Sequence, residues 1–202
     1  MSEKRAFMNY RINDCNSCHR HHCYTRWAVY TGLAVLAAAL IVHRLAGAEL
    51  QPPWPAAPPI MGIGQWINSK PLALKDQLGK VVVVHFWTFG CINCRRNLPY
   101  YNSWRKDFAE REVQIIGVHT HESAHEADND QVALQIKELG IKYPVAVDND
   151  RATWKAYENR YWPGIYLIDK QGRVRFRWDG ELEFQDAGGN LLVRTKIKEL
   201  LA

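Results

Sequence analysis

The feature that most restricts the fold of this chain is a strand-like run that leads directly into a pair of cysteines. Residues 81–87 read VVVVHFW, and continuous β-branched and aromatic runs are typical of strands buried on both faces of a sheet. Cys91 and Cys94 follow as Cys-Ile-Asn-Cys. We expect a helix from about Cys91 to Glu110, kinked near Pro99, because proline cannot supply an interior amide hydrogen.

The rest of the body alternates strand and helix signals in the order βαβ, helix–strand–helix, ββα. This order predicts an α/β sheet with helices on its faces. Further strands are expected at 113–119, 143–147, 165–169 and 174–178, further helices at 129–139, 152–159 and 191–201, and a hairpin turn at 170–173.

Composition favours one packed domain and argues against a nucleic-acid partner. The 202 residues are 47 % hydrophobic and 11 % aromatic, which is enough for a core. The net charge is +5, but residues 1–44 hold six Lys or Arg against two acids, whereas residues 45–202 hold twenty against nineteen. The nearly neutral body lacks the basic footprint that nucleic acid requires.

The spacing of the two cysteines in the body indicates a functional site and not a structural disulfide. A structural disulfide would normally join distant segments, so two cysteines three positions apart favour redox chemistry or metal binding. A zinc site would need two more ligands from histidines and acids, and two inert core thiols are the remaining alternative. The context of a buried strand followed by a helix start favours redox chemistry.

A helix start after a buried strand suits thiol–disulfide exchange. The reaction needs a thiolate, and a free cysteine has a pKa of about 8.5. Unpaired amides and the helix dipole stabilise a thiolate at Cys91, helped by Arg95 and Arg96 if these point toward it. Cys94, one turn later, is placed to attack a mixed disulfide at Cys91. We therefore assign Cys91 as nucleophile and Cys94 as resolving cysteine.

An uncharged run at residues 27–42 predicts one N-terminal transmembrane helix. It is short for a bilayer unless Arg26 and Arg44 extend their charges outward. We interpret residues 1–26 as a cytoplasmic tail and residues 27–48 as an uncleaved anchor, since positive charge precedes the run. The alternative is a signal peptide cleaved after Ala-Gly-Ala at 46–48. Both interpretations export the body.

A proline-rich segment at 49–59 is expected to separate the membrane from the domain. Residues 51–59 hold five of the nine prolines, a composition that favours extended polyproline II structure. We therefore expect a stiff linker and a domain at residues 60–202.

Several segments in the same order resemble exported thioredoxin-like proteins of the TlpA type, and most of all the thioredoxin domain of DipZ-type proteins. The resemblance covers about residues 60–201. It rests on GKVVVVHFWTFGCINC at 79–94, LPY at 98–100, IGVHT at 116–120, YPV at 143–145, DND at 148–150, NRYWP at 159–163 and YLID at 166–169.

The resemblance implies a thioredoxin fold with an inserted helix–strand segment at about residues 121–147, and thiol–disulfide exchange without a cofactor other than the Cys91–Cys94 disulfide. It implies a bacterial inner-membrane protein whose catalytic domain is periplasmic, a link to cytochrome c biogenesis, and partners outside the cytoplasm. Those partners are proteins with thiols or disulfides and a membrane electron donor acting in trans.

The resemblance also names supporting residues. It implies a cis peptide bond before Pro163, with Trp162 in the wall of a substrate groove and Trp87 as a supporting residue of the active site. Without the resemblance, Pro163 would be an ordinary proline at a strand start. His85 departs from the family, which commonly has an acid there to move protons for the resolving cysteine. Histidine could do this, or it could be a neutral core residue bonded to the backbone.

Two clusters outside the cysteine pair have the residue types of metal sites. Cys15, Cys18 and His19 spell a haem-attachment pattern, and with Cys23 they could instead hold zinc or form a reduced, disordered tail. The predicted cytoplasmic location argues against haem. His119, His121 and His125 with Glu122 and Glu126 could bind a metal, but their place after a strand favours a solvated loop. We expect no metal in the domain.

Two other functions remain open. A peroxidase of the peroxiredoxin type needs a Thr or Ser three residues before its cysteine, which Thr88 supplies, but Val84 stands where a proline is expected. A tethered copper or haem-apoprotein chaperone would use both thiols for capture. Ile92 and Asn93 tune the potential of the pair, so the sequence leaves the direction of electron flow open, although the resemblance favours a reductant.

Overall fold

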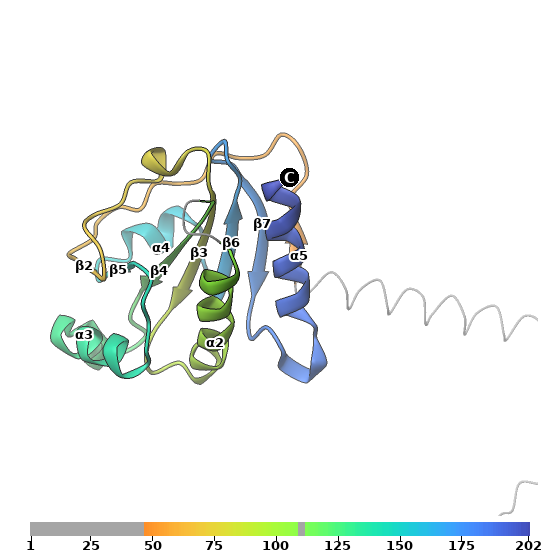
Figure 1. Ribbon diagram of the computed structural model, residues 1–202. Coiled ribbons are helices and arrows are strands. Elements are labelled where there is room, and N and C mark those ends of the chain that lie inside the picture. The colour runs from red at the N-terminus through yellow and green to blue at the C-terminus, as the bar shows by residue number, and fades with distance from the viewer. Residues whose placement is uncertain (1–46, 109–111) are drawn as a thin grey trace, which may run out of the picture. The chain divides into compact units, whose positions relative to one another are not determined.

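The computed structural model describes residues 47–108 and 112–202 (Figure 1). The expected cytoplasmic tail and almost all of the expected anchor lie outside these residues. Within the described ranges, no helix combines the length and apolar character needed to cross a bilayer.

The described residues form a mixed sheet of seven strands in the order β1-β7-β6-β3-β4-β5-β2. The central strand β3 pairs with β4 in parallel and with β6 in antiparallel orientation, so both of its edges are hydrogen-bonded. β4 and β5 extend the parallel part, and β2, β7 and β1 are antiparallel to their neighbours. The strands are β1 Gly47–Glu49, β2 Gln65–Ile67, β3 Val81–Trp87, β4 Val113–His119, β5 Val145–Val147, β6 Gly164–Ile168 and β7 Val174–Asp179.

Helices cover both faces of this sheet, and Figure 1 shows α2 and α5 on one face and α4 on the other. Alternate residues of β3 enter two separate cores: Val81 and Val83 pack with α2, α3 and α5, whereas Val82 and Val84 pack on the side of α4. All seven residues of β3 are buried. The helices are η1 Leu74–Gln77, α2 Ile92–Asp107, η2 Ala124–Ala127, α3 Asn129–Glu138, α4 Ala152–Ala156, η3 Phe184–Asp186 and α5 Gly189–Leu201.

The expected elements of the body are present, with shifts at their ends. α2 ends at Asp107 and α4 at Ala156, both before the expected ends, and α5 starts two residues early. The two edge strands β1 and β2 were not expected from the sequence. Each has three residues, which is too short to show an alternating pattern.

The expected proline-rich linker is not separate from the domain over residues 50–57. The amide of Val174 donates to the carbonyl of Pro55 at 2.9 Å, and the amide of Ala57 donates to Gly172 at 2.8 Å. The guanidinium of Arg175 lies 3.5 Å from the centre of the Trp54 ring. Proline lacks an amide hydrogen but keeps its carbonyl acceptor, so a proline-rich strip can still follow a sheet edge. Moreover, β1, which begins inside the expected anchor, pairs with β7.

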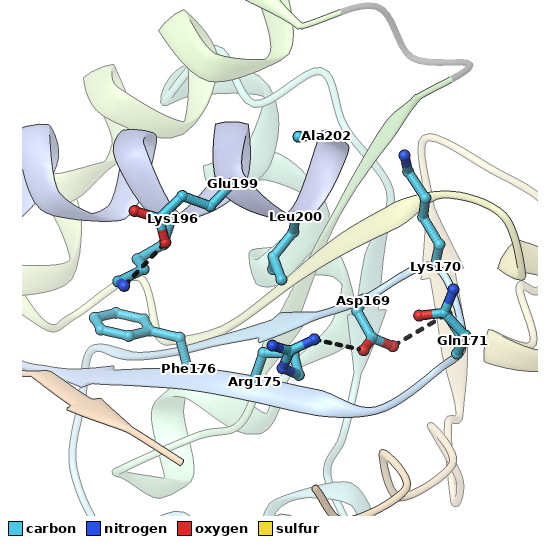
Figure 2. A pocket seen from close by; sticks show the side chains of 9 residues that line it. All are labelled: Asp169, Lys170, Gln171, Arg175, Phe176, Lys196, Glu199, Leu200 and Ala202. Carbon is cyan, nitrogen blue, oxygen red and sulfur yellow. Dashed lines mark hydrogen bonds and ion pairs between the residues drawn. The ribbon is translucent and has the colours of Figure 1, made fainter. Parts of the chain in front are cut away.

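The β6–β7 hairpin is held by the buried carboxylate of Asp169. One oxygen accepts from the amides of Gln171 at 3.0 Å and Arg173 at 2.9 Å, and the other accepts from the side chains of Arg173 at 2.9 Å and Arg175 at 3.2 Å. Figure 2 shows Asp169 between Arg175 and Gln171 in the cavity near the end of α5. Burial alone would raise the pKa of Asp169, but these hydrogen bonds lower it.

We predict that Asp169→Ala lowers the free energy of unfolding by about 2–3 kcal/mol, because it leaves two turn amides and two guanidinium groups without their acceptor. Urea unfolding at pH 7 measures this change. Asp150→Ala removes an exposed turn carboxylate and should cost less than about 0.5 kcal/mol. Equal losses in the two variants would contradict the role of Asp169.

Candidate active site

The sheet register brings three loops together at one end of the domain. Trp87 at the end of β3 aligns with His119 at the end of β4, and Phe86 aligns with Gly164 at the start of β6. The residues that follow β3 and β4 therefore meet those that precede β6. Hydrogen bonds join these loops: the Thr120 amide donates to the Trp87 carbonyl at 3.1 Å, and the Trp162 indole donates to the Thr120 carbonyl at 3.0 Å.

Cys91 and Cys94 lie at this end and are joined by a disulfide. Cys91 is the N-cap of α2, and its sulfur accepts a hydrogen bond from the Cys94 amide at 3.2 Å. The Cys91 side chain is partly exposed, whereas Cys94 has 0 % exposure. An amide that points at sulfur at a helix N-terminus favours the thiolate form of that sulfur. Cys91 is thus both the accessible and the electrostatically assisted cysteine.

The peptide bond before Pro163 is cis, as expected. The Pro163 carbonyl accepts from the amide of Gly180 at 2.7 Å, which ties this loop to the segment after β7. Trp162 packs on Trp154 with ring centres 4.1 Å apart, and the Arg151 guanidinium lies 5.4 Å from the Trp162 ring. These contacts hold the backbone on both sides of the cis bond.

The side chains of His85 and Trp87, near the end of β3, are fully buried. The His85 ring stacks on Tyr101 of α2 with centres 4.0 Å apart and meets the edge of Tyr143 at 5.3 Å. Among the described residues, neither imidazole nitrogen has a hydrogen-bond partner. Burial lowers the pKa of His85 to about 3, so the ring is neutral at neutral pH, without the expected backbone bond. A part in proton transfer stays a prediction.

The inserted segment contributes a buried carboxylate that the sequence analysis considered only as a metal ligand. Glu126 is 5 % exposed, and its Oε1 accepts from the amide of Gly90, the residue before Cys91, at 3.1 Å. Its Oε2 accepts from the amides of Glu122 at 2.7 Å and Ser123 at 2.9 Å. Burial would raise the pKa of Glu126, but these hydrogen bonds lower it, so Glu126 is ionised.

The hydroxyl of Thr88 is buried within the same group of residues. Thr88 Oγ1 lies 3.3 Å from His119 Nε2, and the hydroxyl also bonds to the Glu126 carboxylate. Desolvation lowers the pKa of His119 to about 4, although the charge of Glu126 partly opposes this shift. Residues 47–108 and 112–202 contain no group of three or more histidine, cysteine or acidic side chains that could hold a metal ion. Cys15, Cys18, His19 and Cys23, which the sequence offers as an alternative zinc or haem site, lie outside the described ranges.

Asn97 is a further residue that sequence reasoning missed. It is buried in α2, one turn after Cys94; its amide nitrogen donates to the Gly180 carbonyl at 3.2 Å, and its oxygen accepts from the Leu182 amide at 2.9 Å. Asn97 thus connects the cysteine helix to the segment that holds Pro163. Its signal in the sequence is a polar residue on the buried face of the expected helix.

A cysteine pair at a helix start after the central strand, near a cis-proline, defines a redox protein of thioredoxin-like fold. The chain belongs to the AhpC/TSA family, whose pattern matches residues 61–177. It is a thioredoxin-like enzyme of the thiol–disulfide oxidoreductase class. The expected thioredoxin-like α/β fold and the expected enzyme class are therefore confirmed, whereas the expected transmembrane helix lies almost entirely outside the described residues.

The known proteins that resemble this chain differ in how much of their own length it covers. The chain is 42 % identical over 148 residues to protein DipZ of Mycobacterium tuberculosis, covering 72 % of this chain and 20 % of DipZ, so it spans about a fifth of that relative. It is 31 % identical over 127 residues to the thiol-disulfide oxidoreductase ResA of Bacillus cereus, covering 62 % of this chain and 69 % of ResA. The crystal structure of a thiol-disulfide isomerase from Corynebacterium glutamicum superposes with a TM-score of 0.64 at 30 % identity, covering 72 % and 97 % of the two chains.

We predict that the neutral His85 makes the fold sensitive to acid. The unfolded state binds a proton at a pKa of about 6.5 and the folded state only near pH 3, so stability is lost as the pH falls through this window. Between pH 7 and pH 5, His85→Leu should lose about 2 kcal/mol less unfolding free energy than wild type. Urea unfolding at several pH values measures this difference.

Val83→Ala provides the matched control, because it weakens the core on the side of the sheet where His85 packs against Tyr101, without removing a titratable group. It should lower stability by the same amount at each pH. Stability curves for wild type and His85→Leu that run parallel between pH 7 and pH 5 would show that His85 does not remain neutral in the fold.

Proposed function

We propose that the enzyme reduces disulfides by a two-cysteine mechanism. The Cys91 thiolate attacks one sulfur of a substrate disulfide; a Cys91–substrate disulfide forms and one substrate thiolate leaves. Cys94, as a thiolate, then attacks Cys91, which forms the Cys91–Cys94 disulfide and releases the second substrate thiolate. Two electrons pass from the cysteine pair to the substrate. The supporting observation is that the partly exposed Cys91 caps α2 while Cys94 is fully buried behind it.

The surroundings of the cysteines favour this proposal over a peroxidase. In the peroxidase alternative the hydroxyl of Thr88 would bind peroxide beside Cys91. That hydroxyl has no exposure and is already bonded to His119 and Glu126. Val84, in place of the expected proline, lies inside β3. Peroxide would therefore lack its activating group.

The same burial argues against a copper or haem-apoprotein chaperone. Capture of a metal by two thiolates requires that both sulfurs approach the ion. The Cys94 side chain has no exposure, which leaves a single accessible sulfur. An exchange reaction needs only this one sulfur to meet the substrate.

We further propose that the enzyme acts as a reductant at the outer face of the bacterial inner membrane. The uncharged run at residues 27–42 supports an uncleaved anchor within residues 27–48, and the basic residues before it support a cytoplasmic N-terminus. In this proposal the substrates are exported proteins with disulfides, and the electrons come from a membrane partner in trans. The similarity to ResA, a thiol-disulfide oxidoreductase, supports the exchange activity. A part in cytochrome c biogenesis belongs to the proposal as an implication of the resemblance to TlpA-type proteins.

We predict that Cys94→Ser accumulates a mixed disulfide between Cys91 and substrate, because the sulfur that resolves it is missing. Cys91→Ser should form no mixed disulfide at this site, and neither variant should reduce insulin at more than about 1 % of the wild-type rate. Insulin turbidity and non-reducing peptide mass spectrometry provide these measurements. Rapid peroxide turnover by Cys94→Ser, with no insulin reduction by wild type, would instead favour the peroxidase.

We predict that the full chain remains in the membrane pellet after carbonate washing and is released by detergent. Leu36→Arg with Leu40→Arg should move most of it to the soluble fraction, because a charge near the centre of a membrane helix costs about 2.5–3.5 kcal/mol. The control Leu36→Ile with Leu40→Ile keeps the run apolar. A soluble wild-type product that begins at Glu49 would show that the segment is a cleaved signal peptide.

A further inference from the structure

The inserted segment reaches the backbone that carries the reactive cysteine. Glu126, in η2, directs Oε1 to the amide of Gly90 at 3.1 Å, and Gly90 is bonded directly to Cys91. A Cβ atom on Gly90 would overlap Oε1 of Glu126. The absence of a side chain at Gly90 therefore permits a close approach between a buried carboxylate and the loop before the nucleophile.

The carboxylate at this position carries a full negative charge. It accepts from the amides of Gly90, Glu122 and Ser123 and from the hydroxyl of Thr88. A protonated carboxyl group would have to turn a hydrogen toward one of these four donors. The ionised form satisfies all of them, and the pKa of Glu126 is accordingly low.

No cation neutralises this charge within the hydrogen-bond network. His119 lies behind Thr88, and burial keeps the pKa of His119 at about 4, so its ring is neutral when Glu126 is ionised. His119 Nε2 lies 3.3 Å from Thr88 Oγ1, so Thr88 stands between the neutral ring and the Glu126 carboxylate. Among the described residues, no lysine or arginine forms an ion pair with Glu126.

We propose that Glu126 is a positioning residue for thiol–disulfide exchange: it fixes the loop before Cys91, and its negative charge opposes formation of the Cys91 thiolate. This inference rests on the function proposed above and adds a direction to it. A group that disfavours the thiolate disfavours the reduced pair relative to the disulfide, so the reduced pair gives up its electrons more readily. Glu126 thus makes the cysteine pair a stronger reductant.

Other charged or titratable groups on the elements around Cys91 must stay constant in a test. They are Arg95 and Arg96 of α2, Glu181 after β7, His85 of β3, His119 of β4, His121, Glu122 and His125 of the inserted segment, Arg151 before α4, and Arg160 and Tyr161 before the cis bond. Arg96 is already paired with Glu181 at 3.1 Å. A variant of Glu126 changes none of these side chains.

The test compares the full chain in detergent with its Glu126→Gln variant. The pH dependence of Cys91 alkylation by iodoacetamide, resolved by peptide mass spectrometry, reports the pKa of the Cys91 thiol. Equilibration with reduced and oxidised glutathione reports how easily the Cys91–Cys94 disulfide is reduced. We expect the pKa of Cys91 to fall by about one unit and the disulfide to become about tenfold easier to reduce.

Glu122→Gln is the matched control, since it removes the same charge from an exposed side chain of the same segment. It should leave the pKa of Cys91 within about 0.3 unit, and the glutathione equilibrium constant within about twofold, of the wild-type values. A folded Glu126→Gln variant whose Cys91 pKa stays within about 0.3 unit, and whose glutathione equilibrium constant stays within about twofold, of the wild-type values overturns the proposal. A wild-type pair that fails to exchange with glutathione at all would instead overturn the proposed function.

Gly90→Ala provides a second variant that keeps every charge in the chain. Its methyl group displaces the Glu126 carboxylate from the Gly90 amide, so the pKa of Cys91 should again fall and the disulfide should again be easier to reduce. This variant decides the question if Glu126→Gln does not fold. Loss of the fold in both variants would reduce Glu126 to a structural group and overturn its proposed effect on Cys91.

Discussion

The burial of β3 on both faces and along both edges is the constraint on which the rest of the domain depends. All seven of its residues pair with β4 on one side, five of them, 82–86, pair with β6 on the other, and its side chains enter two different cores. A strand in this position cannot shift by one residue without exchanging its two sets of side chains. The end of β3 is therefore fixed, and with it the position of the loop that carries Cys91.

The sequence was sufficient for the central part of the fold because burial on both faces leaves a strong local signal. The run at Val81–Trp87, the α2 start at the cysteines and the β6–β7 hairpin were all predictable. The edge strands β1 and β2 were not, because three residues show no period and their pairing depends on β7 and β5. The proline content of residues 50–57 predicted a linker separate from the domain. The hydrogen bonds to the carbonyl groups of this segment and the contact of Trp54 with Arg175 depend on the tertiary structure, so the sequence does not reveal them.

The site was predictable to a similar extent and for a related reason. The two cysteines have a fixed spacing, and a cis bond at Pro163 followed from resemblance, so both were found. Asn97 and Glu126 act through backbone amides of segments that are distant in sequence, such as Leu182 and Gly90. Backbone partners carry no residue signature, so no sequence pattern identifies these contacts. His85 was located correctly, but its neutral state follows from the surrounding aromatic rings, which only the fold assembles.

The inserted segment adds a second electrostatic influence on the cysteine pair. A helix N-terminus alone would favour the thiolate, because the Cys94 amide donates to the Cys91 sulfur. The insertion brings an ionised carboxylate to the other side of Cys91, bonded to the amide immediately before it. Two opposing electrostatic effects therefore act on neighbouring peptide groups, one from the core fold and one from the insertion. Because the second effect comes from a separate segment, a substitution in the insertion can alter it while the CxxC and its helix stay the same.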